Sequence, residues 1–248
     1  SISAGGSVEF NASRDTTEAS NNAIEASVGL SIGKDMAGEA SGGFSKGDSS
    51  SDKAQTASIK AGSGGINIKA GKDVSFEGTQ ISSDGQASIS AGGSVNFDAS
   101  QDTTEASDTS IEGSVGFGDE TEASAGFSND DSSSDKAQTT NITVGSGGIN
   151  IEAGKDVNFE GTQVNSDGDV TVGAGGSVNQ KAAESSEKSL SISAEISTED
   201  GPDGGLDIDG EVSSELTSIQ SGGKVTFEPL TAEQKSRLGN NAGTARGR

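Results

Sequence analysis

The 248-residue chain contains no Cys, His, Trp or Tyr, and its only aromatic residues are eight Phe. Without Cys the chain has no disulfide and no thiol nucleophile. Without His it lacks the commonest general base, and the Cys/His zinc site is excluded as well. These absences remove most of the usual catalytic chemistry, so we do not expect an enzyme.

Basic residues are scarce, since 16 Lys and Arg stand against 39 Asp and Glu and leave a net charge of −23. Affinity for nucleic acid depends on cationic contacts to phosphates, so the charge argues against a nucleic-acid partner. Apolar residues make up only 28% of the chain. Composition of this kind is typical of disordered chains, so an ordinary globular core is not expected. No stretch approaches 18 apolar residues, so the sequence encodes no transmembrane helix.

What the chain has in abundance is internal repetition. Residues 1–10 return almost unchanged at 88–97, and residues 49–56 return at 132–139. A third, degraded copy begins at Thr171. Because the repeat is already under way at the first residue, we interpret the chain as part of a longer protein. The offsets predict two full units, 1–87 and 88–170, an atypical unit, 171–228, and a tail or linker, 229–248.

A shorter period of 21 residues lies inside each unit, since Ala70-Gly-Lys-Asp-Val-Ser-Phe76 recurs as Ala91-Gly-Gly-Ser-Val-Asn-Phe97. Within it, short alternating runs are separated by turns rich in Gly and Asp, which predicts short strands. A coil of about 20 residues cannot bury its apolar side alone, but stacked coils can. The sequence therefore predicts an all-β fold, a right-handed parallel β-helix, with three antiparallel β-hairpins inserted into it.

The predicted solenoid has a thin core, which accounts for the low apolar content. Stacking puts Val74 beside Val95 and Phe76 beside Phe97. With coils about 4.8 Å apart, about 150 to 180 coiled residues would form a rod of about 35–40 Å. The core residues that we expect are Val8, Phe10, Ile68, Val74, Phe76, Ile81, Ile89, Val95, Phe97, Ile151, Val157, Phe159, Val178, Val225 and Phe227.

Three segments depart from the 21-residue period, and each alternates apolar with small or polar residues on both sides of a polar break. This pattern predicts a β-hairpin with one apolar face. One repeat offset is 87 residues and the next is 83, and we place the four extra residues at the tip of the first hairpin, where loop length is tolerated. The hairpins are expected near residues 23–45, 110–128 and 189–214. The polar segments 45–57 and 128–140 are predicted to be solvated loops.

The apolar faces of these hairpins have three interpretations. They pack on the solenoid or on one another as a second sheet, they are membrane-active, or they form a partner-binding edge. The membrane interpretation rests on strands of about ten residues with alternating polarity, which also suit transmembrane β-structure. The candidate membrane- or partner-facing residues are Ile24, Val28, Leu30, Ile32, Phe44, Ile111, Val115, Phe117, Phe127, Leu190, Ile192, Ile196, Leu206 and Ile208.

Acidic clusters are the only candidates for cofactor chemistry. One comprises Asp200, Asp203, Asp207, Asp209 and Glu211, and the other Asp130, Asp131 and Asp135. Neither follows the order of an EF-hand loop, so we predict no cofactor and no metal, with weak calcium binding as the alternative. A separate set of turn residues is expected to bond neighbouring backbone, namely Asp15, Asp73, Asp102 and Asp156.

Residues 68–80 and 90–97, followed by Asp102-Thr-Thr-Glu105, resemble the haemagglutinin repeats of large two-partner-secretion exoproteins. More narrowly, residues 1–227 resemble the second class of filamentous-haemagglutinin repeat, found in contact-dependent growth inhibition toxins of the CdiA type. The tail from Pro229 departs from the pattern. Its residues 230–238 are predicted to form a short helix, as a cap, a linker or an expression remnant.

The resemblance implies a parallel β-helix that is exported through an outer-membrane secretion partner and displayed on the surface of a Gram-negative cell. For the growth-inhibition exoproteins it implies association with the target cell's outer membrane, or with proteins in it, and help to a toxin in crossing. The alternative that it implies is a rigid β-helical stalk of a filamentous-haemagglutinin-like adhesin or haemolysin.

Overall fold

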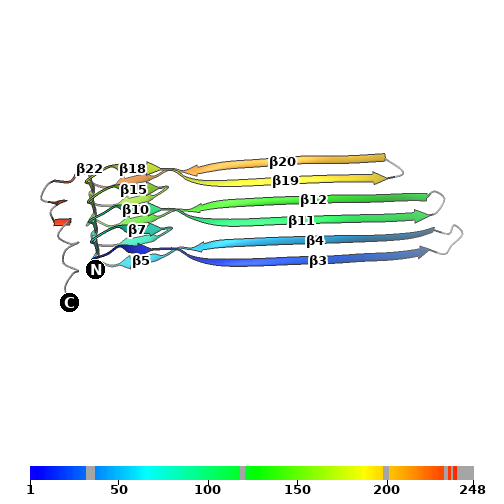
Figure 1. Cartoon of the computed structure of the whole chain (residues 1–248), viewed down its shortest axis with the longest axis horizontal. Helices are drawn as coiled ribbons and strands as arrows, with labels where there is room; N and C mark the ends of the chain where they lie inside the picture. Colours follow the sequence, from blue (N-terminus) through cyan, green and yellow to red (C-terminus); the bar gives the residue numbers. More distant parts are fainter. Residues whose placement is uncertain (32–36, 118–120, 198–200, 232–233, 236, 239–248) are drawn as a thin grey trace.

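Each turn of the solenoid carries three short strands, and the turns stack into three parallel sheets (Figure 1). The computed structural model describes residues 1–31, 37–117, 121–197, 201–231, 234–235 and 237–238. The first sheet contains, from edge to edge, β1 (Ile2–Ala4), β6 (Ile66–Ala70), β9 (Ala87–Ala91), β14 (Ile149–Ala153), β17 (Val170–Ala174) and β22 (Val225–Pro229).

The second and third sheets complete the coils. The second sheet contains β2 (Val8–Phe10), β7 (Val74–Glu77), β10 (Val95–Asp98), β15 (Val157–Glu160) and β18 (Val178–Lys181). The third contains β5 (Ser58–Ala61), β8 (Gln80–Ser83), β13 (Asn141–Val144), β16 (Gln163–Ser166) and β21 (Ser218–Ser221). The predicted all-β parallel β-helix is confirmed.

The register between coils follows the repeat, since Val95 pairs with Val74 and Phe97 with Phe76. The rings of four Phe residues stack along the rod with centroids 5.1 Å apart and planes within 6° of parallel, in the order Phe10, Phe76, Phe97 and Phe159. The coil spacing holds these rings face to face. On the outer face of the same sheet, asparagine side chains form a parallel ladder. Asn158 donates to Asn96 at 2.7 Å and Asn179 donates to Asn158 at 2.8 Å.

Most of the expected core residues are buried inside the solenoid, but five are not fully buried. Val8, Phe10 and Val178 are half-buried, and Val225 and Phe227 are exposed. These two lie on the terminal strand β22, which has only β17 beside it, so one side lacks a covering coil. The sequence prediction also omitted buried residues at equivalent positions, namely Ile66, Ile142, Val144, Ile149, Val164, Val170 and Val172.

The solenoid is shorter than the sequence predicted. Its first sheet is six strands wide, which corresponds to about 24 Å at 4.8 Å per interval, not 35–40 Å. The difference arises because the hairpins take up far more of the chain than expected. Within the described residues the hairpin strands are β3 (Ser13–Ser31), β4 (Ala37–Gln55), β11 (Ser100–Phe117), β12 (Thr121–Gln138), β19 (Ala183–Ser197) and β20 (Gly201–Glu215).

These strands form one antiparallel sheet, in the order β20-β19-β12-β11-β4-β3, that projects from one side of the solenoid and is called here the hairpin sheet (Figure 1). The predicted solvated loops 45–57 and 128–140 were wrong for the most part, because they lie largely in β4 and β12. Leu30 pairs with Gly38 and Phe117 with Thr121, so the four extra residues lie between Leu30 and Gly38.

The hairpins join into one sheet because their width matches the coil spacing. Each hairpin leaves the solenoid at the corner between the second and third sheets, and every second coil carries one hairpin. Two coils advance the rod by about 9.6 Å, which is also the width of two paired strands. Neighbouring hairpins are therefore placed at hydrogen-bonding distance, and β4 pairs with β11 as β12 pairs with β19.

In the coils without a hairpin, the same corner is closed by a Gly-Thr pair. Gly78 and Gly161 have φ of +52° and +56°, in the left-handed region that favours glycine. The buried Thr79 donates its backbone N–H to Thr140 Oγ1 at 3.1 Å, and Thr140 Oγ1 donates to the carbonyl of Asp98. Threonine hydroxyls thus satisfy backbone groups at a corner that would otherwise bury them unpaired.

Three of the four predicted aspartates bond backbone, whereas Asp15 accepts the side-chain amide of Gln55 at 2.9 Å. Asp15 and Asp102 lie in β3 and β11 and not in turns, so the prediction was wrong for these two positions. Asp73 Oδ1 accepts the N–H of Ser94 at 2.8 Å, and Asp156 Oδ1 accepts that of Ser177 at 2.7 Å. Asp102 links the bases of two hairpins, since its Oδ1 accepts the N–H of Ala54 at 2.7 Å. These carboxylates connect one coil or hairpin to the next.

Candidate functional site

The hairpin sheet has one apolar and one polar face, and the register assigns each residue to one of them. Directly paired residues share a face, so Ile24, Phe44, Ile111 and Phe127 form one row across four strands. Two residues nearer the tips, Ala26, Gly42, Gly113, Ala125 and Ile196 form the next row. The row beyond it contains Val28, Ala40, Val115 and Ala123. We call this tip-proximal half of the face the apolar patch.

The structure brings the sequence-predicted surface residues together on this face. Ile24, Val28, Phe44, Ile111, Val115, Phe117, Phe127, Ile192, Ile196 and Ile208 are 39–84% exposed, and Leu190 is half-buried. Leu30 and Leu206 lie on the same face of the sheet, in different rows of β3 and β20, and only their backbone is described. Ile32 lies outside the described residues. Val212, which is 71% exposed, shares the face and was not predicted, although its alternation with Gly210 and Ile208 could have indicated it.

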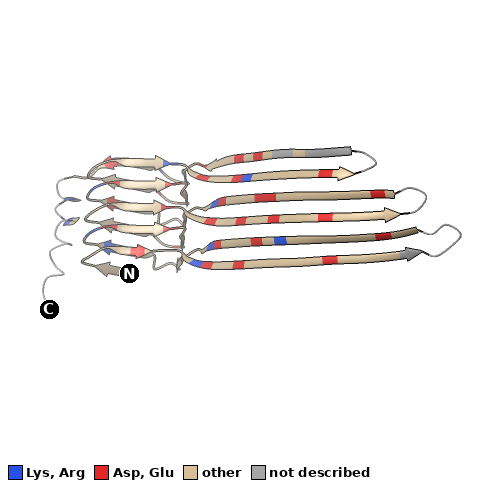
Figure 2. Cartoon of the chain, turned by 45° about the vertical axis from the view of Figure 1, so that its right-hand side comes forward, with Lys and Arg blue, Asp and Glu red and all other residues tan. Residues whose placement is uncertain are grey.

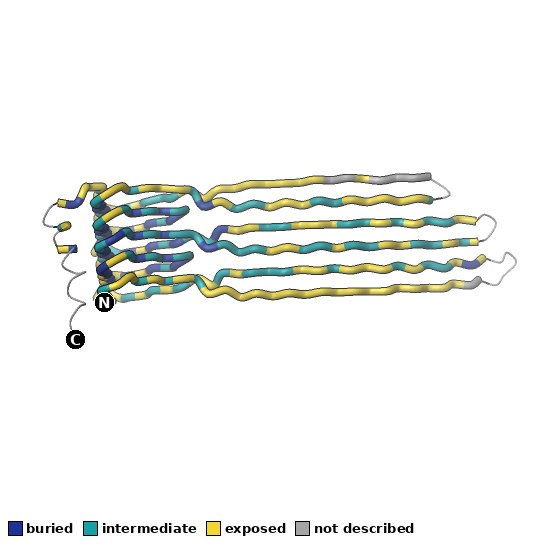
Figure 3. The backbone as a smooth tube through the Cα atoms, in the orientation of Figure 1, coloured by how far each residue is buried: buried dark blue, intermediate teal, exposed yellow. Residues whose placement is uncertain are grey.

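No described element covers either face of the hairpin sheet (Figure 3). The only buried residues in its described strands are Gly38, which lies under the ring of Phe117, and Ser100, Ala137 and Ala183 at the base. The three rows of the apolar patch cross four or five strands, on the order of 400 Å². That is the size of the largest apolar patch on a typical soluble monomer, and such patches are often functional.

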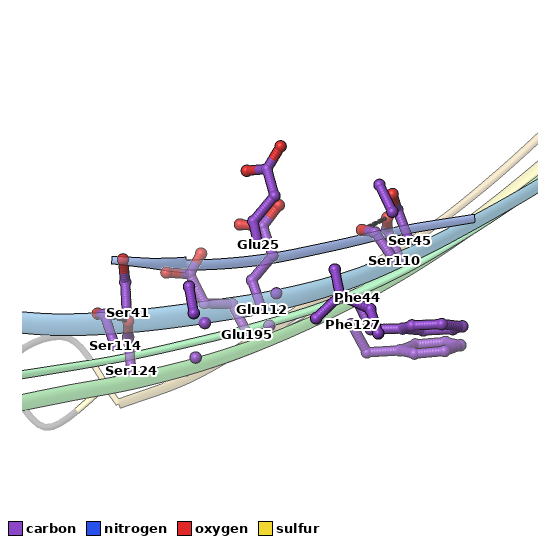
Figure 4. A pocket seen from close by; sticks show the side chains of 18 of the residues that line it. Glu25, Ser41, Phe44, Ser45, Ser110, Glu112, Ser114, Ser124, Phe127 and Glu195 are labelled. Atoms are coloured by element: carbon purple, nitrogen blue, oxygen red, sulfur yellow. Dashed lines mark hydrogen bonds between the residues drawn. The ribbon is translucent and has the colours of Figure 1, made fainter. Parts of the chain in front are cut away.

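The opposite face is lined by serines and glutamates, and it forms an open trough near the middle of the hairpins (Figure 4). Glu25, Glu112 and Glu195 project from it, while Phe44 and Phe127 project from the other side (Figure 4). Gly43 and Gly126 separate the glutamates in one row, so their charges lie on alternate strands, about 9.6 Å apart. Serine hydroxyls bond across strands in the flanking rows, as between Ser114 and Ser124 at 2.7 Å.

Acidic residues are scattered over the solenoid and hairpins (Figure 2). Within the described residues, no three Asp or Glu side chains gather in a way that could hold a metal ion. Strand alternation explains this for the second predicted cluster, because Asp130 lies on the serine face while Asp131 and Asp135 lie on the other. Of the first cluster, Asp200 lies outside the described residues, and Asp203 and Asp207 are described by their backbone alone.

Charged residues end four successive strands of the second sheet and form a column across them. They are Glu77, Asp98, Glu160 and Lys181, which lie in register. Burial, and then repulsion from Glu160 and Glu77, raises the pKa of Asp98 above its usual value of 3.8. Lys181 bonds Glu160 at 2.9 Å, and that carboxylate raises the pKa of Lys181. Repulsion between the stacked carboxylates destabilises the sheet locally, and the positive charge of Lys181 offsets part of that repulsion.

In the part of the chain that the structure describes, no helix is long and apolar enough to cross a membrane. The described structure presents two surfaces, an uncovered apolar patch and a face lined by serines and glutamates, and the solenoid positions both.

Comparison with known proteins agrees with this architecture. The hemagglutinin repeat family matches residues 1–114 and 121–232. A hemolysin of Serratia marcescens is 34% identical over 191 residues, which cover 71% of this chain and 11% of that protein. The chain thus spans about a tenth of the length of this relative. No solved structure matches the chain. By sequence and fold, the chain belongs to the hemagglutinin repeat family, as a repeat region of a secreted, surface-associated exoprotein of Gram-negative bacteria.

Proposed function

We propose that this chain is a non-catalytic repeat segment that associates with the outer membrane of a target cell and supports toxin delivery in contact-dependent growth inhibition. The observation that carries the proposal is the uncovered apolar patch of the hairpin sheet. Ile24 and Val28 are 82% and 84% exposed, although burying such side chains contributes about 1.5–3 kcal/mol each. A surface that leaves such apolar side chains in water is suited to contact with an apolar environment, where they would be buried.

The dimensions of the patch fit a lipid surface. Along β3, the rows from Ile24 to Leu30 span about 20 Å, comparable to the apolar band of about 25 Å that outer-membrane strands present to lipid. The patch lies in the half of the hairpin sheet that is farther from the solenoid (Figure 1). The Serratia relative is named a hemolysin, and haemolysis is an action on cell membranes.

The partners follow from the proposal. The patch would contact the lipids of the target-cell outer membrane or the apolar surface of proteins in it. The full-length exoprotein would also need an outer-membrane secretion partner, which the family implies. With a net charge of −23, approach to an anionic cell surface is opposed, so association rests on apolar burial rather than on charge.

Flotation of the purified chain with outer-membrane vesicles tests the proposal. The variant V28E/V115E puts charge into one row of the patch, at side chains that are 84% and 44% exposed and therefore contribute little to folding. The matched control S27E/S114E puts the same charge one residue away, on the opposite face of the same strands. We expect V28E/V115E to lower the vesicle-bound fraction at least tenfold and the control to retain it.

Equal binding by both variants and the parent chain, with unchanged circular dichroism, would contradict a membrane-facing patch. In the full-length exoprotein, the same pair of variants separates membrane association from delivery. Loss of binding together with loss of toxin entry supports the whole proposal, whereas loss of binding with normal entry leaves only membrane association.

The second candidate function is a rigid stalk of an adhesin or haemolysin. The stacked phenylalanines and the continuous parallel sheets favour it, because they make a stiff rod that needs no contribution from the hairpins. A stalk predicts that V28E/V115E leaves cell binding by the full-length protein unchanged. It also predicts that shortening the rod by one repeat unit is tolerated.

A further inference from the structure

After β22 the chain leaves the coil path and runs back across the outer face of the first sheet, on the flank opposite the hairpin sheet (Figure 1). Leu230 and Leu238 are buried there, with 6% and 2% exposure. A Cβ atom on Gly173 would lie 2.7 Å from Leu230 Cδ2, so the missing side chain of Gly173 makes the room that Leu230 occupies. The carbonyl of Leu238 lies near Gly92, two strands farther along the sheet.

The segment begins with a defined helix start rather than a loose tail. The N–H of Leu230 bonds the carbonyl of Ala174 at 3.0 Å and attaches the segment to β17. Thr231 and Gln234 then bond reciprocally, since each backbone N–H donates to the other residue's side-chain oxygen, at 2.8 and 3.3 Å. This is the capping-box arrangement of a helix N-terminus.

Glu152, on the outer face of β14, is the polar anchor of the segment. Its carboxylate accepts bonds from Arg237 Nη2 at 2.6 Å and from Gln234 Nε2 at 3.3 Å. The side chain of Glu152 is 8% exposed, and a carboxylate is rarely buried to this degree without a cationic partner. Loss of Arg237 would leave the buried charge of Glu152 without its cationic partner, which is costly.

The repeat shows that this docking site is particular to one place on the rod. One unit earlier, 83 residues back, Lys69 stands where Glu152 does and Ser90 stands where Gly173 does. Lys69 would repel Arg237, and the Ser90 side chain would fill the space that Leu230 needs. Two otherwise near-identical units therefore differ at the two residues that the segment contacts.

The rod also loses its internal support at this end. The phenylalanine column stops at Phe159, because Gln180 occupies the next position, and β22 exposes Val225 and Phe227. We propose that residues 230–238 form a clasp that docks on Glu152 and Gly173 and braces the last coils. The inference is independent of the proposed membrane association.

Amide hydrogen exchange on the full 248-residue chain tests the clasp. Glu152→Lys copies the residue of the preceding unit, and we expect it to speed exchange in residues 231–238 at least tenfold. Lys69→Glu makes the opposite change at the equivalent position, outside the clasp, and should leave that exchange unaltered. The double variant E152K/R237E restores an opposite-charge pair and should recover most of the protection.

Exchange of the core strands β7 and β10 serves as the internal check that the solenoid is folded. Because the Arg237 side chain is 62% exposed, Arg237→Ala cannot disrupt the core and provides a second, independent release of the clasp. Unchanged exchange at residues 231–238 in both Glu152→Lys and Arg237→Ala would overturn the proposal. So would an equal effect of Lys69→Glu, or a failure of E152K/R237E to recover protection.

Discussion

At the scale of single residues, the phenylalanine column contains the largest fully buried side chains in the described structure, namely Phe76, Phe97 and Phe159. Phe97 is fully buried between Phe76 and Phe159, whereas Phe10 is half-buried with one ring neighbour. We expect Phe97→Ala to lower the free energy of unfolding by about 3–5 kcal/mol and Phe10→Ala by about half as much. Urea denaturation of the two variants measures this, and equal losses would contradict a graded column.

Asp98 gives the solenoid a dependence on pH. Because its pKa in the folded chain is raised, the protonated form is favoured by folding. The associated stability is fully present below the ordinary pKa of 3.8 and is lost as pH rises through the higher folded value. Asp98→Asn should therefore raise the midpoint of urea unfolding at pH 7, with the advantage vanishing below about pH 4.

Asp48 provides the opposite case. Hydrogen bonds from Lys46 and Ser20 lower its pKa, so its contribution is present at neutral pH and is lost as pH falls through the folded value. Asp48→Asn should slightly lower the unfolding midpoint at pH 7. A shift of the same sign in both variants at pH 7 would contradict these assignments.

At the scale of elements, the hairpins depend on one another. Deleting residues 100–139 with Ala99→Gly gives coil three the Gly-Thr corner that closes coil two, so the solenoid should fold. The strands β4 and β19 would then be separated by the width of the two missing strands, about 9.6 Å more than a paired distance. Isolated two-stranded hairpins are marginally stable, so we expect rapid proteolysis within β3, β4, β19 and β20.

Deleting the whole unit, residues 66–148, is the matched control. This deletion removes two coils together with one hairpin, so β4 and β19 meet in the register that β12 and β19 now use. Limited proteolysis should leave this shorter chain intact. If both deletions are cut at the same rate, the pairing between hairpins is not what protects them.

At the scale of the whole molecule, the net charge of −23 opposes compactness. Screening shortens the range of this repulsion from about 30 Å at 0.01 M salt to about 3 Å at 1 M. The melting temperature should therefore rise with added sodium chloride. A salt-independent melting temperature would mean that stacking distributes the charges widely enough to remove their mutual repulsion.

Much of the solenoid followed from the period alone, because a coil repeats its side-chain pattern wherever it stacks. Val74 and Val95, 21 residues apart, had to meet once the coils stacked. The extent of the hairpins did not follow, because segments such as Ser49-Ser-Ser-Asp have low strand propensity and resemble loops. Their extended form depends on the strands that flank them, and local sequence does not encode those neighbours.

The apolar patch was predictable in composition but not in exposure. Alternation indicated that Ile24, Val28 and Ile111 share a face, since side chains in a strand alternate between its two sides. One of the three interpretations that the sequence left open placed this face against the solenoid or against another hairpin face. In the described structure the hairpins meet edge to edge instead, and no described element lies over either face.

The sequence by itself determined the period, the coil, the corner residues and the sidedness of each hairpin, because these depend on residues a fixed distance apart. Only the tertiary structure decided that three hairpins become one sheet, that no described element covers its apolar face and that the clasp docks at Glu152 rather than at Lys69. The physical reason is geometric. Two coils and two strands have the same width, and the partners that this match brings together are distant in the chain.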